Sequence, residues 1–383
     1  MKSKFFNNIN FITSSLSISV NFFFSTILLT LLSFAGFLDL AAEIGITVSF
    51  TLFFCQIFSA NHRSLIYLNT FDLEINKIIQ FRIFISLVIA IASIVIIIFL
   101  EFENMFFLSL LSILICTQWT TEIILTKKEK NNQTYILNNL LLFNIFYIII
   151  FILLILLNFL HLINYLMITI IITYLLTYRK EMSFKKINKF NFKLIFDVIK
   201  ISVKNLEIIS SFSINFANLI WRLSILFLAG KSVAGLLFGS YALGSFFGTI
   251  YSNIFAPKIH SKKKLFPKKL ILFSIPLVMA IFYYGLVTFE NFENLTNYNS
   301  SRISCILFSL TGSFFMIISL MMRFNYFFNV DAKLVFKIDI FYSILISSTI
   351  VIIFMTLGLK YFVFAYFFAS ICSLAIYSLP YIR

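Results

Sequence analysis

Twelve long apolar runs divide this sequence, and they restrict it to folds that can exist inside a lipid bilayer. Hydrophobic residues make up 61% of the 383-residue chain and charged residues only 12%, which is more apolar than a soluble core requires. A helix crosses the ~30 Å hydrocarbon layer with about 20 apolar residues. The runs lie near residues 11–36, 40–60, 82–100, 104–126, 137–158, 160–178, 204–229, 233–257, 270–289, 302–324, 334–357 and 359–380. The sequence therefore predicts an all-α polytopic membrane protein with twelve transmembrane helices.

The basic residues predict how these helices are oriented. If the N-terminus is cytoplasmic, all but four of the 30 lysines and arginines fall on the inner side. The exceptions are Lys231, Arg302 and Lys360, which face outward, and Arg222, which lies within a span. This asymmetry follows the positive-inside rule, so the net charge of +15 needs no nucleic-acid partner, and the basic inner loops could contact anionic lipid headgroups. We expect both termini in the cytoplasm and an uncleaved first helix, because no small-residue cleavage site follows the basic start.

An internal repeat predicts two halves. The segment SISVNF, which begins at Ser17, matches SFSINF, which begins at Ser211, and the same offset of 194 residues pairs Gly36 with Gly230 and Gly45 with Gly239. An offset of six helices places both copies in the same orientation, as in transporters built from two bundles around an axis along the membrane normal. We expect a six-helix bundle at 1–178, a basic cytoplasmic linker at 179–203 and a second six-helix bundle at 204–383.

One face of the span at 204–229 is polar although the other faces are apolar. Polar faces within membrane helices turn toward protein or a water-filled cavity, so we expect both repeat-related helices to direct polar atoms toward a central cavity. The candidate substrate-binding residues on these two helices are Arg222, Asn218, Asn215, Ser211, Asn21 and Ser17.

Arg222 is the most informative of these residues, because an arginine within a membrane helix costs about 2.5–3.5 kcal/mol on insertion scales. Either it lines the cavity, or its side chain extends to the outer interface. The continuous polar face beneath it favours the cavity. The following span has two GxxxG motifs, Gly235–Gly239 and Gly244–Gly248, which predict close helix packing. Tyr241 and Ser245 share a further face of that span and are additional candidates for the cavity lining.

The remaining polar residues of the spans suggest no catalytic site and no metal site. Glu43 and Glu122 are the candidates if transport is coupled to H⁺ or Na⁺, although an interfacial or ion-paired role is favoured for each of them, as it is for Asp339 near the inner end of its span. The four cysteines lie singly in apolar runs without metal-ligand spacing, so we expect them to act as small packing residues. No loop is long enough for a soluble domain, so any function lies within the helices, and no cofactor is expected.

Several segments resemble a known family. SANHRSLIYLN follows the second span, QWTTEIILTKKE closes the fourth, and WRLSILFLAGKSVAGLLFGSYALGSFFGTIYSNIFAPKI covers the seventh and eighth. With the layout of the whole chain, they resemble the Wzx-type polysaccharide-biosynthesis (O-antigen) flippases of the multidrug/oligosaccharidyl-lipid/polysaccharide (MOP) superfamily.

The resemblance implies a MOP/MATE-like pair of bundles that works by alternating access in a bacterial cytoplasmic (inner) membrane. It also implies a non-enzymatic flippase that moves a polyprenyl-diphosphate-linked oligosaccharide from the cytoplasmic to the outer leaflet. In that family, cations in the central cavity meet the diphosphate, and Arg222 is the position here that matches this role. Membrane lipids and other polysaccharide-assembly proteins are the candidate partners, and a monomer suffices for the mechanism.

Other functions stay open at this point. An ion-coupled exporter, either MATE-like or of the major-facilitator type, has a similar number of helices. A membrane-embedded polysaccharide polymerase or ligase would place acids, histidine or arginine on a large outer loop, which the sequence lacks, and a purely structural membrane protein is a further alternative.

Overall fold

In a computed structural model, the protein is helical wherever it has regular secondary structure in the described part of the chain. The structure describes residues 24–59, 62, 66, 75–131, 133–179, 206–261, 268–290, 298–329 and 332–382. Among these residues, eight helices are long and apolar enough to span a membrane, and three shorter helices are also apolar. The prediction of an all-helical membrane protein is confirmed. Each predicted apolar run overlaps a described helix, whereas a total of twelve crossings stays a prediction.

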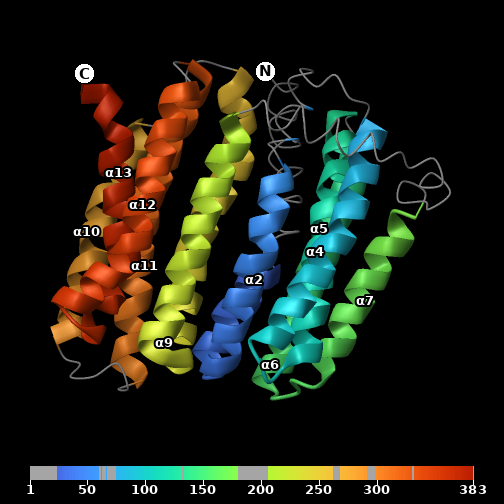
Figure 1. Cartoon of the computed structure of the whole chain (residues 1–383), viewed down its shortest axis with the longest axis horizontal. Coiled ribbons are helices and arrows are strands. Elements are labelled where there is room, and N and C mark those ends of the chain that lie inside the picture. Colours follow the sequence, from blue (N-terminus) through green and yellow to red (C-terminus); the bar gives the residue numbers. More distant parts are fainter. Residues whose placement is uncertain are drawn as a thin grey trace. The chain divides into compact units, whose positions relative to one another are not determined.

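The helices belong to two compact units, which we describe separately (Figure 1). The first unit comprises Met1–Ser25 and Thr47–Phe212, and the second comprises Thr26–Ile46 and Ser213–Arg383. Each unit thus combines stretches from distant parts of the sequence. The domains predicted at 1–178 and 204–383 were defined by the internal repeat, whereas the two units are defined by contacts in the structure. The two predicted domains therefore stay a prediction.

Most of the described first unit consists of four helices and the second part of α2. In this unit α4 packs along α5, which also contacts α6 and α7. The bounds are α2 (Leu38–Ser59), α4 (Ile75–Phe99), α5 (Met105–Lys130), α6 (Thr134–Leu156) and α7 (Leu162–Thr177).

The second unit contains the hairpin Thr26–Ile46 and the helices after α7. Here α11 packs against α10 and α13, and α12 packs against α13. The bounds are α9 (Leu206–Ser261), α10 (Lys268–Glu290), α11 (Tyr298–Asn329), α12 (Ala332–Thr356), η2 (Leu359–Phe364) and α13 (Ala365–Ile382).

Helix α9 is two helices joined at Gly230. A straight helix of its 56 residues would extend about 84 Å, well beyond the ~30 Å hydrocarbon layer. At Gly230 the backbone leaves the helical region, with φ 81° and ψ 169°, which glycine adopts without steric cost. The chain then folds back, because the rings of Trp221 and Tyr241 lie 4.5 Å apart although they are twenty residues apart in sequence. This turn lies between the predicted spans 204–229 and 233–257.

The turn at Gly230 has a counterpart at Gly36. Gly36 has φ 99° and separates a short helix at Phe24–Ala35 from α2. The 194-residue offset pairs these two glycines, and both make a left-handed turn between consecutive apolar helices. The shared geometry supports the internal repeat.

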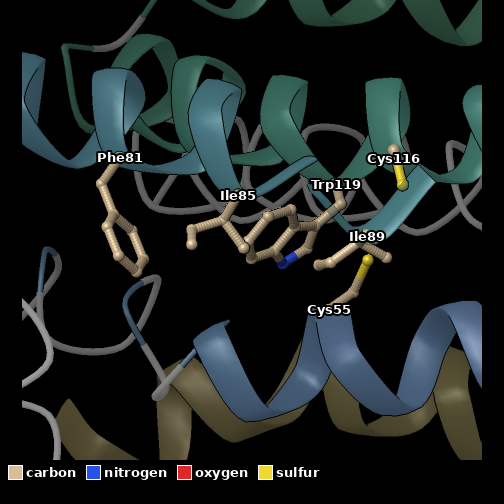
Figure 2. Close-up of a cluster of buried hydrophobic side chains, with 6 residues drawn as sticks. All are labelled: Cys55, Phe81, Ile85, Ile89, Cys116 and Trp119. Carbon is tan, nitrogen blue, oxygen red and sulfur yellow. The ribbon is translucent and has the colours of Figure 1, made fainter. Parts of the chain in front are cut away.

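A dense apolar core joins α2, α4 and α5 in the first unit (Figure 2). It contains two aromatic side chains, two cysteines from different helices and two isoleucines. Its buried members are Cys55, Phe81, Ile85, Ile89, Cys116 and Trp119. Cys55 and Cys116 therefore pack as small apolar residues, as the sequence predicts.

A buried ion pair holds α11, α12 and α13 together in the second unit. Arg323 of α11 binds Asp339 of α12 with both Nε and Nη2, at 3.0 and 2.9 Å. Tyr377 of α13 donates its hydroxyl to the same carboxylate. Asp339 is fully buried and Arg323 is 15% exposed. The sequence identified Asp339 as an acid near the inner end of its span, and the structure supports the ion-pair interpretation.

Removing one partner of this pair should destabilise the second unit. Asp339→Asn leaves the Arg323 guanidinium without its anion, and breaking a buried pair in this way costs about 3–5 kcal/mol. We expect a clearly lower unfolding temperature in detergent. The double variant Arg323→Met/Asp339→Leu removes both charges and should lose less. An equal loss in the single and double variants would contradict a charge-pairing role.

Candidate functional site

Arg222 lies on the first arm of α9 and turns its guanidinium toward protein. Its Nη1 donates to the backbone oxygen of Gly45 in α2 at 2.8 Å, and its guanidinium carbon lies 5.6 Å from the ring centre of Phe238 on the second arm. The side chain is half-buried. A guanidinium over an aromatic ring gains a cation–π attraction in addition to its hydrogen bond. These contacts favour an inward-facing role over extension to the outer interface.

Two of the predicted outer cations also bind the hairpin Thr26–Ile46, which we call the first hairpin. Lys231 Nζ lies 3.0 Å from Oε1 of Glu43, which is only 2% exposed. Arg302 Nη2 lies 3.4 Å from the backbone oxygen of Ser33. Next to the ion pair, Ser232 donates to Asp39 at 2.8 Å. The predicted outer ends of α9 and α11 are thus tied to the first hairpin by charge-assisted hydrogen bonds.

Glycines let the first hairpin approach α9 closely. A Cβ added to Gly235 would lie 1.8 Å from the backbone oxygen of Leu38, and one added to Gly239 would lie 2.2 Å from Cβ of Ser33. A Cβ added to Gly45 would lie 2.3 Å from the ring of Phe238. Only glycine fits at these distances. Gly235 and Gly239 form the first GxxxG motif, so its predicted role in close helix packing is confirmed.

The contacts at Gly45 and Gly239 are reciprocal. These are the two glycines that the 194-residue offset pairs. Gly45 in α2 accepts a hydrogen bond from Arg222 in α9. Gly239 in α9 lies 3.3 Å from the hydroxyl of Thr30, in the helix before α2; this hydroxyl is also 2.9 Å from the oxygen of Thr26. In each case a side chain of one half of the predicted repeat meets a glycine carbonyl of the other half.

The remaining polar face of α9 has a mixed environment. Ser211 and Asn215 are half-buried, whereas Asn218 is exposed. They lie on the same arm as Arg222, at the helical spacing that the sequence predicts. Ser17 and Asn21 lie outside the described residues.

Tyr241 and Ser245, on the second arm of α9, have contacts within the second unit. Tyr241 is 3% exposed, donates its hydroxyl to the backbone oxygen of Phe362 at 3.1 Å and stacks on Tyr366. Ser245 donates to the carbonyl of Ala242 one turn earlier. The structure therefore places both hydroxyls on backbone oxygens of the protein.

Both candidate ion-coupling acids have a cationic partner. Glu43 binds Lys231, as described above. Glu122 in α5 accepts a hydrogen bond from Arg82 Nη1 of α4 at 2.8 Å, and the same nitrogen lies 2.6 Å from the backbone oxygen of Trp119. Arg82 is almost fully buried and lies over the ring of Trp119. Nearby, burial and the positive charge of Arg82 hold the pKa of His62 well below its ordinary range, so this ring is neutral near pH 7.

Sequence reasoning did not assign partners to Arg82, Lys231 or Arg302. For Lys231 a signal was present, because it is a rare outer cation next to the glycine that the repeat pairs with Gly36. Arg222 and Arg302 each donate to a backbone oxygen, and no side-chain pattern could indicate such a contact.

Comparisons with solved structures identify the fold. No family model and no curated protein matches this sequence. One similar structure, described as a MOP superfamily transporter from Pyrococcus furiosus whose binding pocket has reverse polarity, aligns with a TM-score of 0.53 at 10% identity, over 97% of this chain and 95% of its own. A multidrug resistance MATE family transporter of the MOP superfamily in an outward-facing conformation aligns with the same score and identity, over 98% and 95%.

These alignments cover nearly the whole of each chain. The chain has the fold of the MOP superfamily transporters. This result confirms the MOP/MATE-like fold class that the sequence predicts and disfavours the major-facilitator alternative. At 10% identity, the cargo stays undetermined.

The glycine contacts predict a sharp steric effect. In Gly235→Ala the new methyl group would overlap the backbone oxygen of Leu38, which cannot move without the helix. We expect the variant to lose about 1–3 kcal/mol of stability, as in other overpacked cores, measured by thermal unfolding in detergent. Gly285→Ala is the matched control, because its nearest neighbour would be Cβ of Leu307 at 3.3 Å. Equal losses in the two variants would contradict the close approach.

Proposed function

We propose that this protein is a flippase that moves a polyprenyl-diphosphate-linked oligosaccharide from the cytoplasmic to the outer leaflet by alternating access. The proposal combines the MOP fold, which supports transport, with the sequence resemblance to Wzx-type flippases. The location would be a bacterial inner membrane. The observation that carries the proposal is an arginine held within an apolar helix with its guanidinium turned toward protein.

The chemistry of Arg222 suits a diphosphate. A guanidinium presents five donors in a planar fork that matches phosphate oxygens, and it keeps its charge at any physiological pH. Nη1 of Arg222 donates to the backbone oxygen of Gly45, which holds the guanidinium on the side of α9 that faces protein. The electrostatic attraction to a phosphate is stronger in a low-dielectric surrounding than in water.

The other candidate residues suit the sugar part of such a cargo. Asn215 and Asn218 follow one another at helical spacing below Arg222, and their amides both donate and accept hydrogen bonds, as sugar hydroxyls do. Asn21 and Ser17 would contribute from the repeat-related helix. In this arrangement the polyprenyl tail stays in the bilayer, since transferring it to a polar site would be unfavourable.

An ion-coupled exporter of the same superfamily is the second candidate, favoured by the alignment with a multidrug transporter. Such an exporter needs an acid that can exchange H⁺ or Na⁺ during the cycle. Glu43 and Glu122 each form an ion pair at 2.8–3.0 Å in this conformation. A coupling role for either acid would require that its pair opens during transport.

The test of the flippase proposal is substitution of Arg222. Arg222→Ala should lower the outer-leaflet appearance of lipid-linked oligosaccharide about tenfold or more, because hydrogen bonds to charged groups contribute about 1.5–3 kcal/mol each. Arg222→Lys should retain part of the rate, since an ammonium keeps the charge but lacks the fork. The measurement is leaflet-resolved accumulation of the labelled lipid in cells that depend on this protein.

A matched control separates cargo binding from packing. Lys360→Ala removes another predicted outer cation, whose ammonium lies 5.1 Å from the ring centre of Phe289, but leaves Arg222 in place. Its flipping rate should exceed that of Arg222→Ala at equal protein level. Normal flipping in Arg222→Ala, or an equal defect in both variants, would exclude a diphosphate-binding role for Arg222.

A further inference from the structure

The first hairpin belongs to one half of the chain by its sequence and to the other compact unit by its contacts. By the internal repeat it belongs to the first half of the chain, together with the helices up to residue 178. By its contacts it belongs to the second compact unit, with α9 and the helices that follow. The contacts concerned lie at the predicted outer end of the spans. They comprise the Glu43–Lys231 ion pair, the Asp39–Ser232 and Arg222–Gly45 hydrogen bonds, and the glycine approaches at Gly45, Gly235 and Gly239. We call this set the outer clasp.

We propose that the outer clasp is the extracellular gate of the transport cycle, with the Glu43–Lys231 pair as its latch. A protein that works by alternating access must separate its two halves at the outer end to release cargo there. The clasp contacts join the two repeat halves at this end, together with the hydrogen bonds of Arg302 to Ser33 and of Thr30 to Gly239. When the gate opens, the first hairpin leaves α9. The proposal rests on the alternating access of the proposed function but not on the identity of its cargo.

The latch has an asymmetric construction. Glu43 is 2% exposed, whereas Lys231 is 37% exposed. The lysine can therefore regain water when the pair breaks, while the carboxylate can do so only if the hairpin itself moves. A buried charge that loses its partner is strongly destabilising. Removing Lys231 should consequently drive the hairpin away from α9 more strongly than neutralising Glu43.

Close packing and charge act together in this gate. At the three glycines, the backbone of one repeat half contacts atoms of the other half. The gate can therefore close only when the surfaces of the hairpin and α9 fit together. The hydrogen bonds of Arg222 to Gly45 and of Thr30 to Gly239 occupy carbonyl lone pairs that only such an approach can reach. All of these contacts are lost together when the hairpin moves as one body, so opening should be cooperative.

The test measures the accessibility of a residue behind the clasp. Ser33 is fully buried, and Ser33→Cys is nearly isosteric. In a background without the four native cysteines, purified protein in liposomes is exposed to a membrane-impermeant maleimide from the outer face. Labelling should be slow with the latch intact, about tenfold faster in Lys231→Ala and about two- to threefold faster in Glu43→Gln.

The double variant Glu43→Gln/Lys231→Ala distinguishes a latch from general loosening. Because it no longer contains a stranded carboxylate, it should label more slowly than Lys231→Ala alone. Lys360→Ala removes a predicted outer cation that lies over the ring of Phe289 and is not a member of the clasp, so it should label as slowly as the parent. Thermal unfolding of every variant reports whether it is folded.

Unchanged labelling in Lys231→Ala, or labelling of the double variant at least as fast as that of Lys231→Ala, would overturn the latch. Equal acceleration in Lys360→Ala would do the same. Since the readout is accessibility and no cargo is present, failure of the gate leaves the flippase proposal standing. Conversely, loss of the flippase proposal through the Arg222 variants leaves the gate intact.

Discussion

Within a bilayer, a polar group that loses water must find its partner inside the protein, and the outer clasp is arranged around this constraint. Helical carbonyls already accept a bond from the next turn, but each has a second lone pair. A side chain of another helix reaches that lone pair more easily where no side chain covers the backbone. Gly45 and Gly239 lack side chains, and their oxygens are the ones that meet Arg222 and Thr30. The same two glycines thus allow the helices to approach closely and let their backbone oxygens accept these hydrogen bonds.

The same constraint explains where the charged residues occur. The described spans contain ion pairs that join different helices: Glu43 with Lys231, Arg82 with Glu122, and Arg323 with Asp339. Two of the acids are almost fully buried, and an isolated carboxylate at such a position would be very costly. Each pair therefore makes the packing of its helices specific, because an incorrect arrangement would strand a charge. The cost of opening a pair then depends on which partner can return to water.

Much of the fold could be predicted from the sequence because apolar run length and glycine placement are local signals. The break of α9 at Gly230 falls between two predicted spans, and the GxxxG motif marks where α9 receives the first hairpin. The partners of the charges could not be predicted, since Arg222 binds a backbone oxygen and Asp339 binds a residue of another helix. The grouping of the first hairpin with α9 could not be predicted from the sequence either. The repeat assigns the hairpin to the other half, and only three-dimensional contacts reveal which elements a given conformation brings together.

The position of Arg222 connects the two proposals. If the guanidinium binds a diphosphate, the cargo shares a side chain with the contact that holds Gly45 against α9. Binding that draws the guanidinium away from the Gly45 oxygen weakens the clasp, and a closed clasp restrains the guanidinium. Linkage requires these effects to be equal in free energy. A lysine at this position would offer a point charge without the fork that lets one side chain meet two acceptors in different directions. Arg222 is costly to place in an apolar helix. Its two roles together, in binding cargo and in holding Gly45 against α9, explain its presence better than either role alone.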